Sequence, residues 1–224
     1  MCLETIVKKF TASFLLLVLA STGAADTIEL PARLDALLGN EVTVQGQTFS
    51  DFTYMASGDM PAASAITVMP LHESEGFGLR FQGAFIDTAT STDPSVAEIG
   101  YTIPLNLEAG VSSASLVGNP LIVNGTGLAE VTTSFVDNAT GLMIFADGSQ
   151  QQLVDVQDIN SPIGNSVEVL HKMSLQSQNA SSAVLSFVDQ TFSIVPEPAA
   201  FAPMMLGLFV LLGATSRNKR RCIK

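Results

Sequence analysis

The residues best suited to metal binding or acid–base chemistry form a short cluster in the first half of the chain. His72, Glu73 and Glu75 lie within four positions, so an imidazole and two carboxylates can approach one ligand from a short loop. Their spacing matches no metal-binding motif, and the second histidine, His171, can join them only if the fold brings it there. We predict that these are solvated loop residues, with a metal or acid–base site as the alternative.

A second set of carboxylates could supply oxygen ligands to calcium. Asp147, Asp155 and Asp158 lie close together in the sequence, and calcium binds several carboxylate and carbonyl oxygens. The acidic order of a helix–loop–helix calcium loop, D-x-D-x-D-G, is absent. We predict that they are turn and edge-strand residues that discourage aggregation, with a calcium site as the alternative.

Motifs of common catalytic sites are missing from the sequence. It has no G-x-S-x-G elbow, no phosphate-binding Walker loop and no dinucleotide fingerprint. Two histidines give thin support to a Ser-His-Asp triad. We therefore predict a non-enzymatic protein without a cofactor. The alternative enzyme is a secreted β-sandwich hydrolase that uses His72 or His171 with nearby carboxylates.

Two features bear on glycans. The chain has no Trp and only two Tyr, Tyr54 and Tyr101, which weakens carbohydrate binding because sugar sites commonly stack on aromatic faces. Asn124, Asn138 and Asn179 each match the N-glycosylation pattern. We predict that these three asparagines are turn residues.

The elements that must position these residues are mainly short strands. Apolar residues alternate with polar ones more often than they recur at helical spacing, and Gly, Asn, Asp, Ser and Pro separate the segments. This pattern predicts an all-β fold, an antiparallel β-sandwich or jelly-roll-like domain, with one short helical segment at residues 30–38. The predicted strands are residues 42–44, 48–54, 65–69, 78–86, 98–105, 121–123, 128–136, 142–145, 152–156, 167–175 and 183–195.

Charge and cysteine content exclude some partners. Residues 26–198 hold three basic residues against 20 of the 21 acidic ones, a formal charge of about −17. Nucleic acid is excluded as a partner because phosphate backbones need clustered Lys and Arg. The two cysteines, Cys2 and Cys222, lie outside this region, so the domain must be stable without disulfides.

The N-terminus has the order of a secretory signal peptide. Lys8 and Lys9 precede an apolar run at residues 10–20, and small residues follow up to Ala25. The run is too short to span about 30 Å of hydrocarbon, so a retained membrane helix is disfavoured. We predict a signal peptide at residues 1–25, cleaved after Ala25.

The C-terminus has three parts. Pro196, Glu197 and Pro198 precede an apolar stretch at residues 199–215, and a basic tail at residues 216–224 follows. Seventeen helical residues measure about 26 Å, which just spans a bilayer. The positive-inside bias keeps the basic tail in the cytoplasm, as it does Lys8 and Lys9, so both ends predict that residues 26–198 are translocated.

This tail resembles the PEP-CTERM sorting signal of Gram-negative bacteria over about the last 30 residues. The resemblance implies that a membrane-embedded sorting protease, exosortase, cuts near Pro196, Glu197 and Pro198, which are then a processing motif and not a catalytic site. It divides the chain into a signal peptide, a β-rich extracytoplasmic domain at residues 26–194 and a sorting signal at residues 195–224.

The expected function is therefore that of an exported, non-enzymatic protein of the cell envelope or extracellular matrix. It is anchored in the cytoplasmic membrane by its C-terminal helix until it is processed. The expected partners are the secretion machinery and exosortase, with extracellular polysaccharide or calcium as candidate ligands. A calcium-dependent adhesin or carbohydrate-binding module is the alternative among binding proteins.

Overall fold

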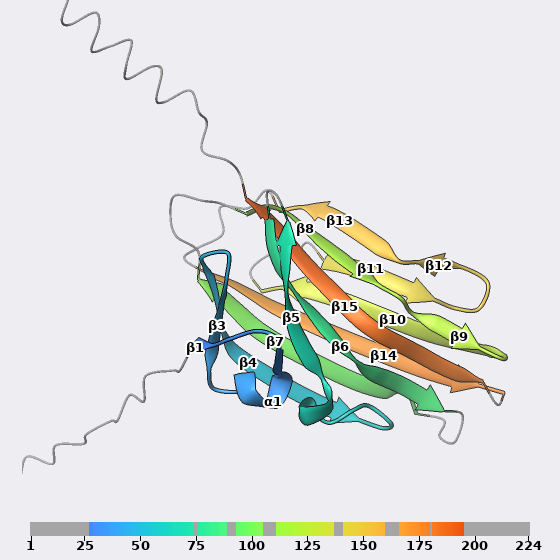
Figure 1. Cartoon of the computed structure of the whole chain (residues 1–224). Coiled ribbons are helices and arrows are strands. Elements are labelled where there is room, and N and C mark those ends of the chain that lie inside the picture. The colour runs from blue at the N-terminus through green and yellow to red at the C-terminus, as the bar shows by residue number, and fades with distance from the viewer. Residues whose placement is uncertain are drawn as a thin grey trace, which may run out of the picture.

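The fold consists of two β-sheets packed face to face (Figure 1). The structure is a computed structural model that describes residues 27–73, 76–88, 93–104, 111–136, 141–159, 166–179 and 181–194. The predicted all-β sandwich is confirmed for this part of the chain. Its strand pairs are antiparallel except for β1 with β3, and a parallel bridge joins Leu38 to Phe52.

The first sheet has eight strands in the order β1-β3-β4-β7-β14-β10-β11-β12. Its central strands are long, and its edge strands β1 and β12 have two residues each. In that order the strands are Thr27–Ile28, Glu41–Val44, Gln47–Ser57, Ser95–Pro104, Ser166–Gln178, Thr126–Phe135, Gly141–Ala146 and Gln151–Gln152.

The second sheet has the order β13-β8-β15-β6-β5-β2, and β9 pairs with β15 beyond the end of β8. These strands are Val154–Asp158, Val111–Gly118, Ser182–Ile194, Gly76–Thr88, Thr67–Glu73 and Ala32–Arg33, with β9 at Leu121–Val123. A short helix, α1 (Leu34–Leu37), and a 3-10 turn, η1 (Ala63–Ala65), lie beside each other in the first part of the chain. The short helix falls within the predicted segment 30–38.

The core forms where the alternating apolar positions of the two sheets meet. In β14, Val167, Val169, Met173 and Leu175 are buried while the residues between them are more exposed, because successive side chains of a strand point to opposite faces. Aromatic rings join the sheets, as in the pairs Phe49–Phe77, Phe81–Tyr101 and Phe135–Phe192, with centroids 5.8, 6.0 and 6.2 Å apart. This packing holds the sandwich together without disulfides in the described residues.

A polar side chain fills the break between β8 and β9. Asn119 precedes the buried Pro120, and its Oδ1 atom accepts hydrogen bonds from the backbone amides of Ser186 and Phe187, at 3.0 and 3.2 Å. These two residues lie where the register of β15 against β6 shifts. Asn119 therefore satisfies backbone donors that the irregular pairing of β15 leaves open.

Candidate functional site

His171 lies in the core and not at a ligand-accessible surface. It belongs to β14 and is wholly buried between the sheets. Its Nδ1 atom lies 2.7 Å from the Thr133 hydroxyl, and its Nε2 atom lies 3.2 Å from the Tyr101 hydroxyl. The ring also contacts Phe81 edge-on, with centroids 5.6 Å apart.

Burial shifts the pKa values of His171 and of its partner Tyr101. Desolvation lowers the pKa of His171 from an ordinary 6.5 to about 3, and burial raises the pKa of Tyr101 well above its usual value. The neutral imidazole has one donor and one acceptor nitrogen, and two hydroxyls complete its hydrogen bonds. His171 is therefore a buried core residue with both ring nitrogens hydrogen-bonded, and it does not reach the surface, as the alternative hydrolase site would require.

His72 lies apart from His171, on a strand. The sequence predicted a loop at this point, but β5 continues through Glu73, and His72 pairs with Phe77 of β6. The prediction failed because the β5–β6 hairpin is longer than the apolar pattern suggested. His72 is exposed, whereas the Glu73 side chain and Glu75 lie outside the described residues, so the predicted cluster stays a prediction.

Two of the three aspartates for which a calcium site was the alternative bind backbone donors, one in a turn and one on an edge strand, as predicted. Asp147 accepts hydrogen bonds from the amides of Ser149 and Gln150 in the turn after β11, at 2.9 and 2.8 Å. Asp155 of β13 accepts one from the amide of Met143, at 2.8 Å. No group of three or more His, Cys, Asp or Glu side chains in the described part of the chain is placed to hold a metal ion.

A buried carboxylate that the sequence did not reveal links three strand ends. Asp87, at the end of β6, is 1 % exposed and accepts hydrogen bonds from Ser95 Oγ and from Ser177 N and Oγ, at 2.6, 2.7 and 2.6 Å. Burial alone would raise the pKa of Asp87, but hydrogen bonds from Ser177 and Ser95 outweigh it, so the pKa is lowered. The partners lie 8 and 90 positions away in sequence, and no local motif marks the site.

Asp87 also borders a hollow of about 350 Å³. Asp59 and Asp93 are among its other lining residues. The amide of Asp59 donates to Ser95 Oγ, and its carboxylate accepts from the amide and hydroxyl of Thr88. The carboxylates of Asp59 and Asp87 thus connect β6 to the segments around it and have structural partners already.

An ion pair lies on the outer face of the second sheet. Arg80 of β6 binds Asp189 of β15 through two parallel contacts, Nε–Oδ1 at 2.6 Å and Nη2–Oδ2 at 2.7 Å. The guanidinium also lies 4.6 Å from the ring centroid of Phe187. Arg80 is therefore held by a bidentate pair and a cation–π contact.

Two of the three asparagines of the N-glycosylation pattern lie in turns, as predicted. Asn124 lies between β9 and β10 with a φ of 58°, and Asn179 lies after β14 with a φ of 54°. Asparagine tolerates this left-handed backbone better than most residues. The side-chain Nδ2 atom of Asn179 also donates a hydrogen bond to Thr126 Oγ1 at 3.1 Å, which links the two turns. Asn138 lies outside the described residues.

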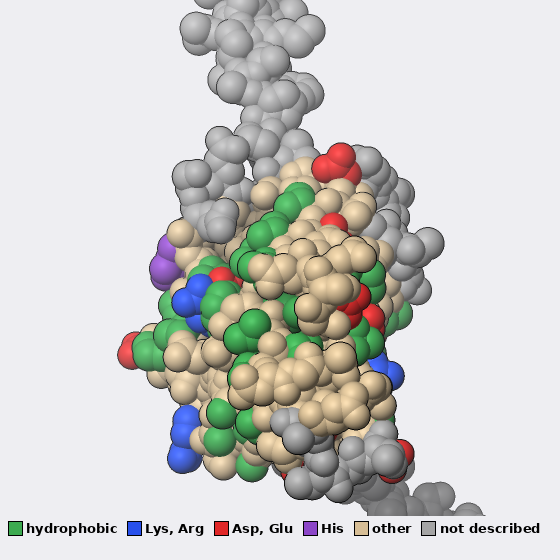
Figure 2. All heavy atoms as spheres, turned by 90° about the vertical axis from the view of Figure 1, so that its right-hand side faces the viewer, with side chains coloured by type: hydrophobic (Ala, Val, Ile, Leu, Met, Phe, Trp, Pro, Cys, Tyr) green, Lys and Arg blue, Asp and Glu red, His purple; other side chains and the backbone are tan. Residues whose placement is uncertain are grey.

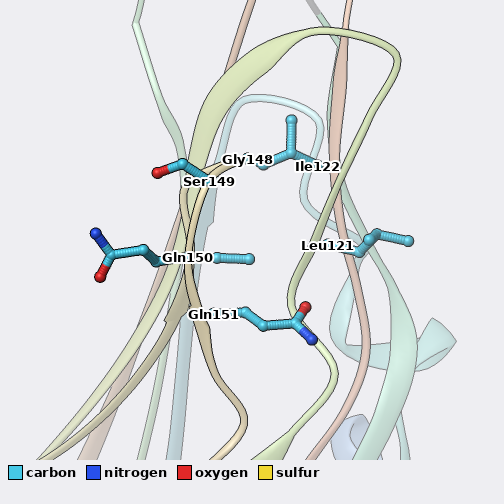
Figure 3. Close-up of a pocket in the computed structure, with 7 residues that line it drawn as sticks. Leu121, Ile122, Gly148, Ser149, Gln150 and Gln151 are labelled. Atoms are coloured by element: carbon cyan, nitrogen blue, oxygen red, sulfur yellow. The ribbon is translucent and has the colours of Figure 1, made fainter.

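A second hollow lies between β9 and the β11–β12 turn. It measures about 350 Å³, and Figure 3 shows Ile122 and Gln151 bordering it from opposite sides while Gln150 points outward. The lining residues are Leu121, Ile122, Ala146, Gly148, Ser149, Gln150 and Gln151. None carries a formal charge. Figure 2 looks onto this end of the sandwich, where uncharged side chains and backbone cover most of the view and basic side chains lie toward its margins.

The predicted processing residues lie outside the described part of the chain. These are Ala25, Pro196, Glu197 and Pro198. The predicted transmembrane segment at residues 199–215 also lies outside it. Among the residues that the structure describes, no helix is long and apolar enough to cross a membrane.

No family model and no curated protein sequence matches this chain. Among solved structures, TmCBM61 in complex with β-1,4-galactotriose matches 61 % of the chain and 86 % of its own length at 12 % identity, with a TM-score of 0.31. The enzymatically active domain of bacteriophage CBA120 tailspike protein 4 matches 65 % of this chain at 11 % identity and a TM-score of 0.29. A family two carbohydrate esterase from Cellvibrio japonicus matches 67 % at 17 % identity and a TM-score of 0.25.

The matched region spans only 20 % of the tailspike chain and 36 % of the esterase chain. At such TM-scores these likenesses carry no functional argument. The function of this chain must therefore be argued from its own residues.

Proposed function

We propose that this chain is an exported, non-enzymatic β-sandwich protein of the cell envelope or extracellular matrix, sorted through its C-terminal signal. The observation that carries the proposal is the position of the folded domain between the two predicted processing sites. The first strand, β1, begins at Thr27, two residues after Ala25. The last strand, β15, ends at Ile194, two residues before Pro196.

The position of β15 makes cleavage at the motif compatible with a stable domain. This strand lies inside the second sheet, with β6 on one side and β8 and β9 on the other. A cut within β15 would remove a central strand and much of the core. A cut near Pro198 leaves every described strand in place, so the tail can be released without unfolding the sandwich.

The placement of His171 supports a non-enzymatic role. A general base must reach a substrate proton within hydrogen-bond distance, directly or through one water. His171 is wholly buried and hydrogen-bonded to Thr133 and Tyr101. The hydrolase alternative is left with His72, which is exposed on a strand of the other sheet.

The test is the intact mass of the protein recovered from the envelope and the medium of its bacterial host. We expect the wild type to lack about the first 25 residues and the residues beyond about Pro198. The triple variant Pro196→Ala, Glu197→Ala, Pro198→Ala should keep its tail and remain in the membrane. A matched control, Glu29→Ala with Pro94→Ala, changes the same residue types at exposed positions and should be processed normally.

Two results would contradict the proposal. A wild-type protein that keeps residues 199–224 outside the cytoplasm has a permanent anchor and no sorting signal. A wild-type protein that keeps residues 1–25 and stays in the cytoplasm is not exported at all.

A further inference from the structure

We propose that the hollow between β9 and the β11–β12 turn is a binding site for a neutral, hydroxyl-rich ligand of the saccharide class. This inference deepens the proposed function, because an extracellular location supplies the setting in which such a ligand is met. The argument rests on the chemistry of the lining residues, the rigidity of the turn that carries them, and the position of the hollow in the fold.

The lining offers hydrogen bonds without charge. The Gln151 side chain borders the hollow, and its amide combines an acceptor oxygen with two donor hydrogens, whereas the Gln150 side chain points outward (Figure 3). Hydroxyl groups, which also both donate and accept, complement such amides. An ionic ligand would find no opposite charge among the seven lining residues, so the neutral class is favoured.

The opposite wall is apolar. Ile122 and Ala146 border the hollow on this side, and Leu121, which is 49 % exposed, lines its rim with its side chain pointing away from the glutamines (Figure 3). A pyranose ring has C–H faces that bury well against aliphatic side chains and an equatorial rim of hydroxyls. A volume of about 350 Å³ lies within the range of small-molecule sites.

The turn that carries the glutamines is fixed before any ligand binds. Asp147 Oδ1 accepts hydrogen bonds from Ser149 N, Ser149 Oγ and Gln150 N, at 2.9, 2.8 and 2.8 Å. The amide of Asp147 donates in turn to the carbonyl of Gln150 at 3.1 Å, and Gly148 adopts a φ of 84°. A preformed turn avoids the entropy cost of ordering a loop on binding.

The hollow also lies at the end of the sandwich opposite the C-terminal end of β15 (Figure 1). Figure 1 shows β9 and β12 at one end of the sandwich and the C-terminal end of β15 at the other. The sorting motif follows β15 in the sequence, so a protein tethered through its C-terminal segment can present the hollow away from the membrane. A matrix polysaccharide can reach that end both before and after the tail is removed.

Affinity should be weak because no aromatic ring lines the hollow. Tyr101 is buried in the core, and the Tyr54 hydroxyl binds the carbonyl of Pro61. Hydrogen bonds and aliphatic contact alone predict a Kd for one site of about 1 mM. Repeated weak contacts along a polymer can still retain a protein in a matrix.

The test follows the side-chain amide NMR signal of Gln151 in the full chain, held in detergent micelles. Cellohexaose, xylohexaose and mannohexaose are the neutral probes. Hexagalacturonate is the acidic control, and a neutral serine–glycine hexapeptide is the peptide control. We expect saturable shifts with at least one neutral sugar and none with either control. Shifts with hexagalacturonate or with the peptide alone, or no shift with any neutral sugar at tens of millimolar, would overturn the proposal.

Matched variants locate the site. Gln151→Ala should raise the Kd roughly fivefold, the effect of one lost hydrogen bond to a neutral partner. Leu121→Asp should weaken binding, because it adds a charge at the rim of a hollow whose lining is uncharged. The controls are Gln82→Ala and Leu170→Asp, which make the same changes on exposed positions of other strands. Equal loss of binding in a control and its site variant would contradict the assignment, and the mass measurement above tests sorting independently.

Discussion

The Nδ1 atom of His171 lies 2.7 Å from the Oγ1 atom of Thr133, and both side chains are buried between the two sheets. The two residues lie opposite each other in the β10–β14 register. With the Tyr101 hydroxyl on the other ring nitrogen, they form a polar network inside an apolar core. Such a network stabilises the fold only while the imidazole stays neutral.

Protonation of His171 should therefore destabilise the protein in acid. Because the folded-state pKa of about 3 lies below the ordinary 6.5, the unfolded chain binds more protons between these values. Its contribution to stability is fully present above pH 6.5 and is lost as the pH falls toward 3, at up to about 1.4 kcal/mol per pH unit. Chemical denaturation at several pH values measures this slope.

The chain provides a matched control for this prediction. His72→Gln replaces the only other histidine, which is exposed, and should keep the wild-type slope. His171→Gln should lower stability at pH 7, because the new side chain fits Thr133 and Tyr101 imperfectly, and should flatten the slope between pH 6.5 and 4. An unchanged slope in His171→Gln would show that His171 is accessible and protonates normally in the folded protein.

The contribution of Asp87 to stability should be present at pH 7 and should be lost only at a lower pH than that of His171. Asp87→Asn places an amide among the donors Ser95 and Ser177 and should cost about 2 kcal/mol of unfolding free energy at pH 7. Since the folded-state pKa of Asp87 is lowered, its contribution is present above about pH 4 and is lost as the pH falls further. The deficit of the variant should shrink in that acidic range.

The control for Asp87 is Asp158→Asn, at the exposed end of β13. Urea denaturation at pH 7 should separate the two variants clearly. Equal stability of Asp87→Asn and wild type at pH 7 would mean that the carboxylate gains nothing from Ser95 and Ser177.

The alternating pattern of the sequence predicted most of the long strands, because each buries one face. It missed β8, whose inward positions Val111, Ala114 and Leu116 are separated by serines and give a weak strand signal. It also joined residues 152–156 into one strand. In the structure, Leu153 separates β12 from β13, which belong to different sheets, and no Gly or Pro marks that change.

The candidate sites were less predictable than the strands. Gln151 and Leu121 border one hollow from different strands, and no spacing rule relates positions that far apart. The burial of His171 was implicit in the alternation of β14, since Val169 and Met173 flank it on the same face. Its two hydroxyl partners depend on strand order, which local sequence does not specify.

The Arg80–Asp189 pair should show measurable coupling. Its side chains are 34 % and 12 % exposed, and the bidentate geometry favours a net gain. A double-mutant cycle with Arg80→Met and Asp189→Asn should give about 1 kcal/mol, reduced little by salt. Arg80→Lys should recover only part of it, because an ammonium cannot make both contacts.

The Arg33–Asp35 pair is the matched control. Its contact is 3.3 Å, and its side chains are 67 % and 37 % exposed, so the same cycle should give no measurable coupling. Equal coupling energies for the two pairs would contradict the role given to burial and bidentate geometry.

Asp155 should protect an open sheet edge. Strand β12 covers β11 only at Phe145 and Ala146, so the amide of Met143 lacks a strand partner and donates to Asp155 instead. Val154 and Val156, which flank Asp155 on β13, are 51 % and 57 % exposed. The neighbouring edges of the two sheets, at β11 and at β13, are therefore prone to association. Asp155→Ala should speed hydrogen exchange at the Met143 amide and promote concentration-dependent association.

Asp155→Asn separates the lost hydrogen bond from the lost charge. It removes the same charge as Asp155→Ala but keeps an acceptor oxygen for the Met143 amide. We expect Asn to retain slow exchange and the monomeric state, as followed by NMR exchange and light scattering. Equal association of the two variants would mean that the negative charge, and not the hydrogen bond to Met143, protects the edge.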